Sequence, residues 1–171
     1  MLDTIRRLVN AMPAGAPRDQ LMTMLGALGD RASTQTLTSA GLAIKAGGSA
    51  IVKAGSLFYA CVQGVLVKVA ANTDQAALVG TVTNAKFNVF CFFLDKAGTG
   101  TSAMGVEGAS LAAVKWPPLP AGKALVGFVV INPTGTGNFV GGTTALDDAT
   151  VVPNAAYVSC GGAFDPTILV G

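Results

Sequence analysis

Two hydrophobic patterns divide the chain near residue 32. Before that point, apolar residues recur every three or four positions, which is the spacing of an amphipathic helix. They are Leu2, Ile5, Leu8, Val9 and Met12 in one segment, and Leu21, Met24, Leu25 and Leu28 in the next. The pattern predicts two short helices over residues 1–31, with Pro17 in the first turn of the second helix and Gly29 as its C-cap.

The two predicted helices form an N-terminal arm whose docking surface is left open. Each helix spans about 12 residues, which is too short for stability in isolation. The arm therefore needs the core of its own chain, an oligomerisation stalk made with other copies, or an anchor site in a larger assembly. The candidate interface residues of the arm are Leu2, Ile5, Leu8, Val9, Leu21, Leu25 and Leu28.

From residue 33 onward the helical spacing is lost, and turn signals follow one another about every 8–12 residues, which is typical of a β-sandwich or barrel. Gln63-Gly64 separates two apolar runs and predicts a two-residue hairpin. Residues 84–86 predict a second hairpin, between strands at 77–83 and 87–94. Further strands are predicted at residues 37–45, 99–106, 123–132 and 155–160.

Two segments of this region are distinctive. Residues 87–94 are apolar on both faces apart from Asn88, which predicts a central strand covered on both sides. Residues 116–122 hold three prolines and predict an extended connector without ladder hydrogen bonds. We therefore expect a mainly β protein: an antiparallel, jelly-roll-like β-sandwich or barrel (residues 32–171) carrying an arm of two short helices (residues 1–31).

The composition contains more apolar surface than a small globule hides easily, with 51% hydrophobic residues and a mean hydropathy of +0.56. No uninterrupted apolar run reaches the length of about 18 residues that a membrane helix needs. Asp3, Arg6 and Arg7 interrupt the N-terminus, so no signal peptide is expected. The surplus apolar surface is best placed in subunit contacts, which predicts a homo-oligomer.

Charge is scarce after the arm. Residues 32–171 hold seven lysines, five aspartates and one glutamate, roughly a third of the usual density. The net charge of +2 is too small and scattered for a nucleic-acid partner. The arginines, Arg6, Arg7, Arg18 and Arg31, all lie in the arm. They fit either contact with an acidic partner or a solvated helix face that Asp3, Asp19 and Asp30 nearly balance.

The chain offers little for catalysis. It has no histidine, which excludes Ser-His-Asp, Cys-His and imidazole-metal sites. Its single glutamate is Glu107, and the neighbours Asp147 and Asp148 would face opposite sides of an extended segment. We expect no enzyme, no catalytic residue, no cofactor and no metal.

Cys61, Cys91 and Cys160 are odd in number and widely spaced, which argues against a disulfide framework and indicates a reducing site of synthesis. Trp116 precedes the proline connector and has two interpretations. It is either an interface anchor of the hot-spot type or a plug in the core at one end of a barrel.

Residues 116–154, WPPLPAGKALVGFVVINPTGTGNFVGGTTALDDATVVPN, resemble a segment found in small structural proteins of tailed bacteriophages and prophages. Residues 41–48 (GLAIKAGG) and 87–94 (FNVFCFFL) fit the same pattern. The resemblance covers about residues 36–166 and carries no active site.

The resemblance implies a virion protein, made in the cytoplasm of a bacterial host. The first expectation is a capsid decoration or cement protein, or a head-fibre protein. Such a protein would be a homo-oligomer, trimeric at a capsid three-fold axis, and would bind the major capsid protein. The alternative is a tail-fibre or baseplate component that binds a host surface glycan. A small wall hydrolase is disfavoured by the missing histidine.

Overall fold

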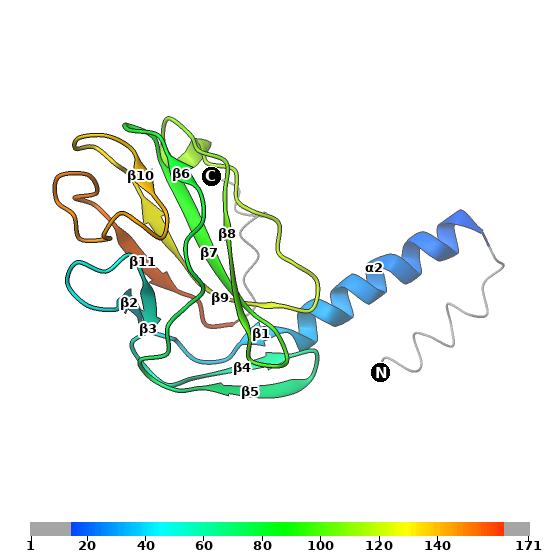
Figure 1. Cartoon of the computed structure of the whole chain (residues 1–171). Coiled ribbons are helices and arrows are strands. Elements are labelled where there is room, and N and C mark those ends of the chain that lie inside the picture. Colours follow the sequence, from blue (N-terminus) through cyan, green and yellow to red (C-terminus); the bar gives the residue numbers. More distant parts are fainter. Residues whose placement is uncertain (1–14, 163–171) are drawn as a thin grey trace.

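The computed structural model describes residues 15–162 of the chain. These residues are mainly antiparallel β structure with one long helix (Figure 1). The helix is α2 (Ala16–Ser33). The strands are β1 (Gln35–Thr36), β2 (Leu42–Ile44), β3 (Val52–Ala54), β4 (Phe58–Val62), β5 (Val65–Val69), β6 (Thr81–Val82), β7 (Asn88–Leu94), β8 (Gly100–Met104), β9 (Ala124–Ile131), β10 (Phe139–Val140) and β11 (Ala156–Ser159), with a 3₁₀ turn at Leu111–Ala113.

These strands form four sheets. The largest has the order β11-β9-β7-β8, the second has the order β1-β4-β5, and β2-β3 and β10-β6 form two-stranded sheets. All strand pairs are antiparallel. The prediction of a mainly antiparallel β protein is confirmed, but the described strands do not close into a barrel.

Strand β7 lies at the centre of the fold, as its unbroken apolar sequence predicts. It pairs with β9 on one side and β8 on the other, and all seven of its residues are buried. Phe90 and Phe92 contribute to the main core, which the four-stranded sheet shares with the smaller sheets. Cys91 and Phe93 point to a second core on the opposite face. Alternation along a strand covered on both faces accounts for this division.

The second core is covered by the proline connector. Residues 116–122 lie outside the strands, as predicted, and Trp116 and Leu119 pack against the buried cluster around Cys91. Three prolines withhold backbone donors from any ladder. The segment therefore contributes side chains to the core and does not extend a sheet.

The first predicted hairpin is confirmed. Val62 pairs with Val65, and both residues of the intervening turn have positive φ, 51° at Gln63 and 79° at Gly64. This is the geometry of a type I′ turn, whose twist suits a two-residue hairpin.

The second predicted hairpin is wrong. Strand β6 pairs with β10, so the turn at residues 84–86 joins two different sheets. Both edges of β7 are already occupied by the longer strands β8 and β9, which leaves no edge for β6.

The strand predicted at residues 37–45 is also interrupted. Within it, only Leu42–Ile44 forms a strand, which pairs with β3. Gly41 adopts a φ of 57° that an extended strand cannot contain.

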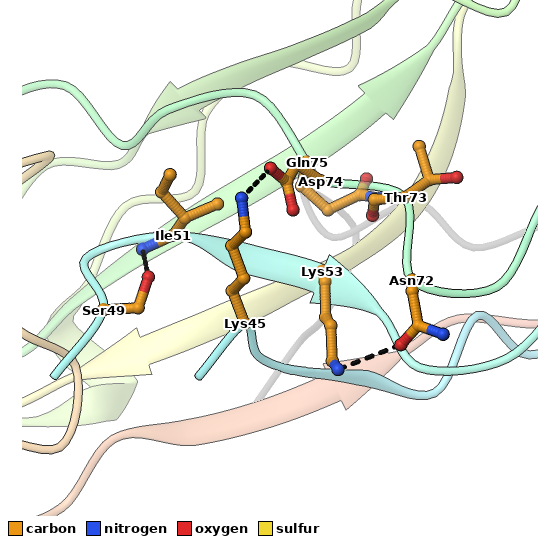
Figure 2. A network of polar contacts seen from close by, with 8 residues as sticks. All are labelled: Lys45, Ser49, Ile51, Lys53, Asn72, Thr73, Asp74 and Gln75. Atoms are coloured by element: carbon orange, nitrogen blue, oxygen red, sulfur yellow. Dashed lines mark hydrogen bonds and ion pairs between the residues drawn. The ribbon is translucent and has the colours of Figure 1, made fainter. Parts of the chain in front are cut away.

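Charged side chains of the body fasten one long loop to the β2–β3 hairpin (Figure 2). Lys45 forms an ion pair with Asp74, and the Lys53 ammonium donates to the Asn72 side chain at 3.0 Å. Backbone bonds reinforce this contact, since the Ala54 amide donates to the Thr73 carbonyl at 2.9 Å. Surface ion pairs contribute little, about 0–1 kcal/mol each. These few charges therefore position a loop and do not form a charged binding surface.

Helix α2 begins as predicted, with Pro17 in its first turn, but the predicted C-cap at Gly29 is wrong. The helix continues to Ser33 and is capped at Thr34, whose extended backbone places its amide on the Arg31 carbonyl. The predicted boundary near residue 32 therefore falls within the last turn of the helix. The first predicted helix lies outside the described residues.

Candidate assembly interface

Helix α2 projects from the β body and meets it at its C-terminal end (Figure 1). The Asp30 carboxylate accepts a hydrogen bond from the Gly122 amide at 3.0 Å. The Ser33 carbonyl accepts one from the Gly64 amide at 3.1 Å. We call these contacts, with the bond described next, the helix clamp. They tie the last turn of α2 to the β4–β5 turn and to the end of the proline connector.

The third bond of the helix clamp involves Thr34. Its hydroxyl oxygen accepts from the Gln63 amide at 3.1 Å. Because only Thr34 separates α2 from β1, the direction of the helix is fixed at the point where the sheet begins. The clamp therefore fixes the last turn of α2 against the body.

A cleft of about 310 Å³ lies beside the helix clamp. It is lined by Gly26, Ala27, Asp30, Arg31 and Thr34 of the helical segment and by Leu119, Pro120, Ala121 and Lys123 of the body. Its polar groups have internal partners: Asp30 binds the Gly122 amide, and the Lys123 ammonium donates to the Thr101 hydroxyl at 3.1 Å. We interpret the cleft as the joint between helix and body.

Four apolar side chains share one face of α2, and we call them the α2 stripe: Leu21, Met24, Leu25 and Leu28. Met24 is 70% exposed and Leu28 is 66% exposed, whereas Leu21 and Leu25 are half-buried. The structure thus places three predicted interface residues on a single stripe. The other four from the arm, Leu2, Ile5, Leu8 and Val9, lie outside the described residues.

A second apolar surface lies on the outer side of the β1-β4-β5 sheet, and sequence reasoning missed it. Phe58, Ala60 and Val62 of β4 point into the main core, so Tyr59 and Cys61 point outward. The strand register places Leu66 opposite Cys61 and Lys68 opposite Tyr59. We call this surface the outer sheet face; its members are Gln35, Leu37, Leu57, Tyr59, Cys61, Leu66 and Lys68.

Three leucines of the outer sheet face are well exposed: Leu66 at 64%, Leu37 at 46% and Leu57 at 42%. The run of apolar residues on both faces of 57–62 was the signal that could have revealed it. Such a strand needs cover on both sides.

Trp116 belongs to the second core. It is half-buried, and its ring packs edge-on against Phe128 with the ring centroids 4.7 Å apart. Its contacts within the body favour the interpretation as a core residue, and its role as an interface anchor stays a prediction.

The carboxylates that sequence reasoning considered for chemistry stabilise loops. Glu107 accepts hydrogen bonds from the Thr83 amide and hydroxyl, both at 2.9 Å, and these lower the pKa of its carboxyl. The Thr150 hydroxyl and amide likewise lower the pKa of Asp148. Asp147 instead accepts from the Gly48 amide. In residues 15–162, no group of three or more histidine, cysteine, aspartate or glutamate side chains could hold a metal ion.

The three cysteines are free thiols. Burial raises the pKa of Cys91 to about 12 and that of Cys160 to about 11, so both are protonated and unreactive at neutral pH. Cys61 is half-buried on the outer sheet face.

Comparison with protein-family models, with curated proteins and with solved structures gave no match to this chain. Within the described part of the chain, no helix is both long enough and apolar enough to cross a membrane.

Proposed function

We propose that the chain is a non-catalytic structural protein of a tailed-bacteriophage virion, which assembles as a homo-oligomer through its N-terminal arm. The observation that carries this proposal is the exposure of the α2 stripe. An 18-residue helix stands off the body while Met24 and Leu28 remain 70% and 66% exposed.

The energetic case follows from the hydrophobic effect. Burying one leucine or methionine side chain fully contributes about 1.5–3 kcal/mol. Most of the stability of a helix in a protein comes from packing of its apolar face, so packing of the α2 stripe against another surface would stabilise both the helix and the complex. Another protein surface is the appropriate partner, because the clamp holds α2 away from its own sheets.

The β body suits a virion component. Its sheets would form a jelly-roll-like β-sandwich around the main core, and its few charges fasten loops. The sequence resemblance of residues 116–154 points to a capsid decoration or cement protein, or to a head fibre. In this role the arm, including residues before α2, would join copies into a trimer, and the trimer would bind the major capsid protein.

Cryo-electron microscopy of particles that carry the chain tests the location. Density repeating on the capsid lattice is expected. Density confined to the tail would instead support a tail-fibre or baseplate role, with a host surface glycan as the ligand.

Sedimentation velocity of the purified full chain at micromolar concentration tests assembly independently of location. An oligomer is expected, and a stable monomer would contradict the proposal. A Met24→Asp, Leu28→Asp variant should sediment as a monomer, while Val79→Asp should assemble normally. Val79 is 73% exposed and lies outside both apolar surfaces.

A further inference from the structure

We infer that α2 of one copy packs across the outer sheet face of a second copy. The inference rests on the proposed self-assembly and specifies the surface that receives the helix. Two exposed apolar surfaces lie within one chain, one on a helix and one on a sheet. A helix lying on a sheet face is one of the standard layered arrangements of protein cores.

The chain's own α2 cannot cover its own outer sheet face. Helix α2 ends at Ser33 and β1 begins at Gln35, so no loop allows the helix to fold back. The bonds from Gly122 to Asp30 and from Gly64 to Ser33 hold the helix pointing away from the body (Figure 1). A second copy, by contrast, can supply each surface with an apolar partner.

The two surfaces match in size. From Leu21 to Leu28 the α2 stripe extends about 10 Å, because an α-helix rises about 1.5 Å per residue. Across its three strands the outer sheet face measures about 10 Å, because neighbouring strands lie about 4.8 Å apart. One helix can therefore cover the width of the sheet.

Exchange also covers more apolar surface than the pairing of two α2 helices would. Side-by-side helices would bury the α2 stripe but leave Leu37, Leu57 and Leu66 in solvent. Because a helix and a sheet face are different surfaces, the exchange contact is heterologous, and it must close into a ring or continue as a filament. A closed ring of three copies agrees with the proposed trimer.

Cys61 provides a direct test, because it is a natural thiol within the outer sheet face. Met24→Cys would place a second thiol on the α2 stripe of the full chain. Mild oxidation with diamide should then join the introduced thiol of one copy to Cys61 of another, detected as covalent dimers and trimers on a non-reducing gel and assigned by peptide mass spectrometry. The added substitution Cys61→Ser should abolish that product.

The matched control is Thr23→Cys, because position 23 lies on the side of α2 opposite the stripe and its side chain is exposed. It should give no cross-link to Cys61. A disulfide joining two introduced thiols at position 24 would overturn the inference in favour of helix–helix pairing, while leaving self-assembly intact. A monomer under all conditions would overturn the proposed function as well.

Complementation by mixing provides a second readout. Leu28→Asp damages the α2 stripe, and Leu66→Asp damages the outer sheet face at a residue that is 64% exposed. Each variant alone should be monomeric with an unchanged β-type circular dichroism spectrum. A mixture should form a one-to-one dimer, because the intact helix of one chain fits the intact sheet face of the other. Normal assembly of Leu66→Asp would overturn the inference.

Discussion

The helix α2 and the β body have apolar side chains of similar kind but bury them very differently. In the body, Phe90 and Phe92 are at most 1% exposed between the four-stranded sheet and the smaller sheets. In α2, Met24 and Leu28 are more than half exposed. The body therefore buries its apolar core within one chain, whereas the helix leaves two large apolar side chains exposed. Stability of the fold and assembly of copies should respond to different substitutions.

The largest effect is expected from a substitution in the body. Phe92→Ala should lower the free energy of unfolding by about 3–5 kcal/mol, because it removes a fully buried ring and leaves a cavity. Urea denaturation followed by circular dichroism measures the change. Leu28→Ala is the matched substitution in the arm. If it destabilised the monomeric body equally, α2 would belong to the core, and the contrast between the two regions would fail.

Two glycines should respond with opposite signs. Gly64→Ala should destabilise the body by about 1–2 kcal/mol, because Gly64 has a φ of 79° that alanine adopts only with strain. Gly26→Ala should stabilise α2 by up to about 1 kcal/mol, because it replaces glycine within a helix. An added Cβ would meet no atom within 4 Å at either position, so the backbone alone decides the outcome. Chemical denaturation measures the first change, and hydrogen exchange of α2 amides measures the second.

A smaller effect is expected where the two regions meet. Asp30→Ala removes the acceptor of the Gly122 amide and should weaken the helix clamp by about 1 kcal/mol. Amides of the last turn of α2 should then exchange faster while those of β7 are unchanged. Asp19→Ala is the control, since Asp19 lies far from the clamp along the helix. Equal exchange in both variants would show that the clamp does not hold the helix.

The smallest effect concerns pH. The Thr83 hydrogen bonds lower the pKa of Glu107 in the folded protein, so their contribution to stability is present above the unfolded pKa of about 4.3. It is lost as the pH falls through the lower, folded value. Glu107→Gln should therefore reduce the dependence of the melting temperature on pH between neutral and strongly acidic solution. A parallel pH profile for wild type and variant would contradict this role of Glu107.

Patterns within a single strand or turn were predictable from the sequence. The apolar run ending at Leu94 predicted the central strand, and Gln63-Gly64 predicted the first hairpin, because each depends on neighbouring residues. The turn at residues 84–86 wrongly predicted that β6 pairs with β7. The partners of β7 are β8 and β9, which follow later in the chain. Likewise, Gly29 predicted the end of the helix, but the helix continues to Ser33. Hydrogen bonds of Asp30 and Ser33 with distant residues help to hold this last turn.

The same distinction applies to the candidate interface. Helical spacing alone placed Leu21, Leu25 and Leu28 on one stripe. The clamp could not be predicted, because it joins Asp30 to Gly122 across most of the chain. The outer sheet face also required the strand register, which brings Leu66 beside Cys61.

Sedimentation equilibrium of the full chain measures whether α2 buries its stripe against another copy. At micromolar concentration we expect a closed oligomer, a trimer of three 17.1 kDa chains. Met24→Asp combined with Leu28→Asp should reduce it to a folded monomer. A wild-type chain that remains a 17.1 kDa monomer, with the same sedimentation as the variant, would show that α2 does not join copies.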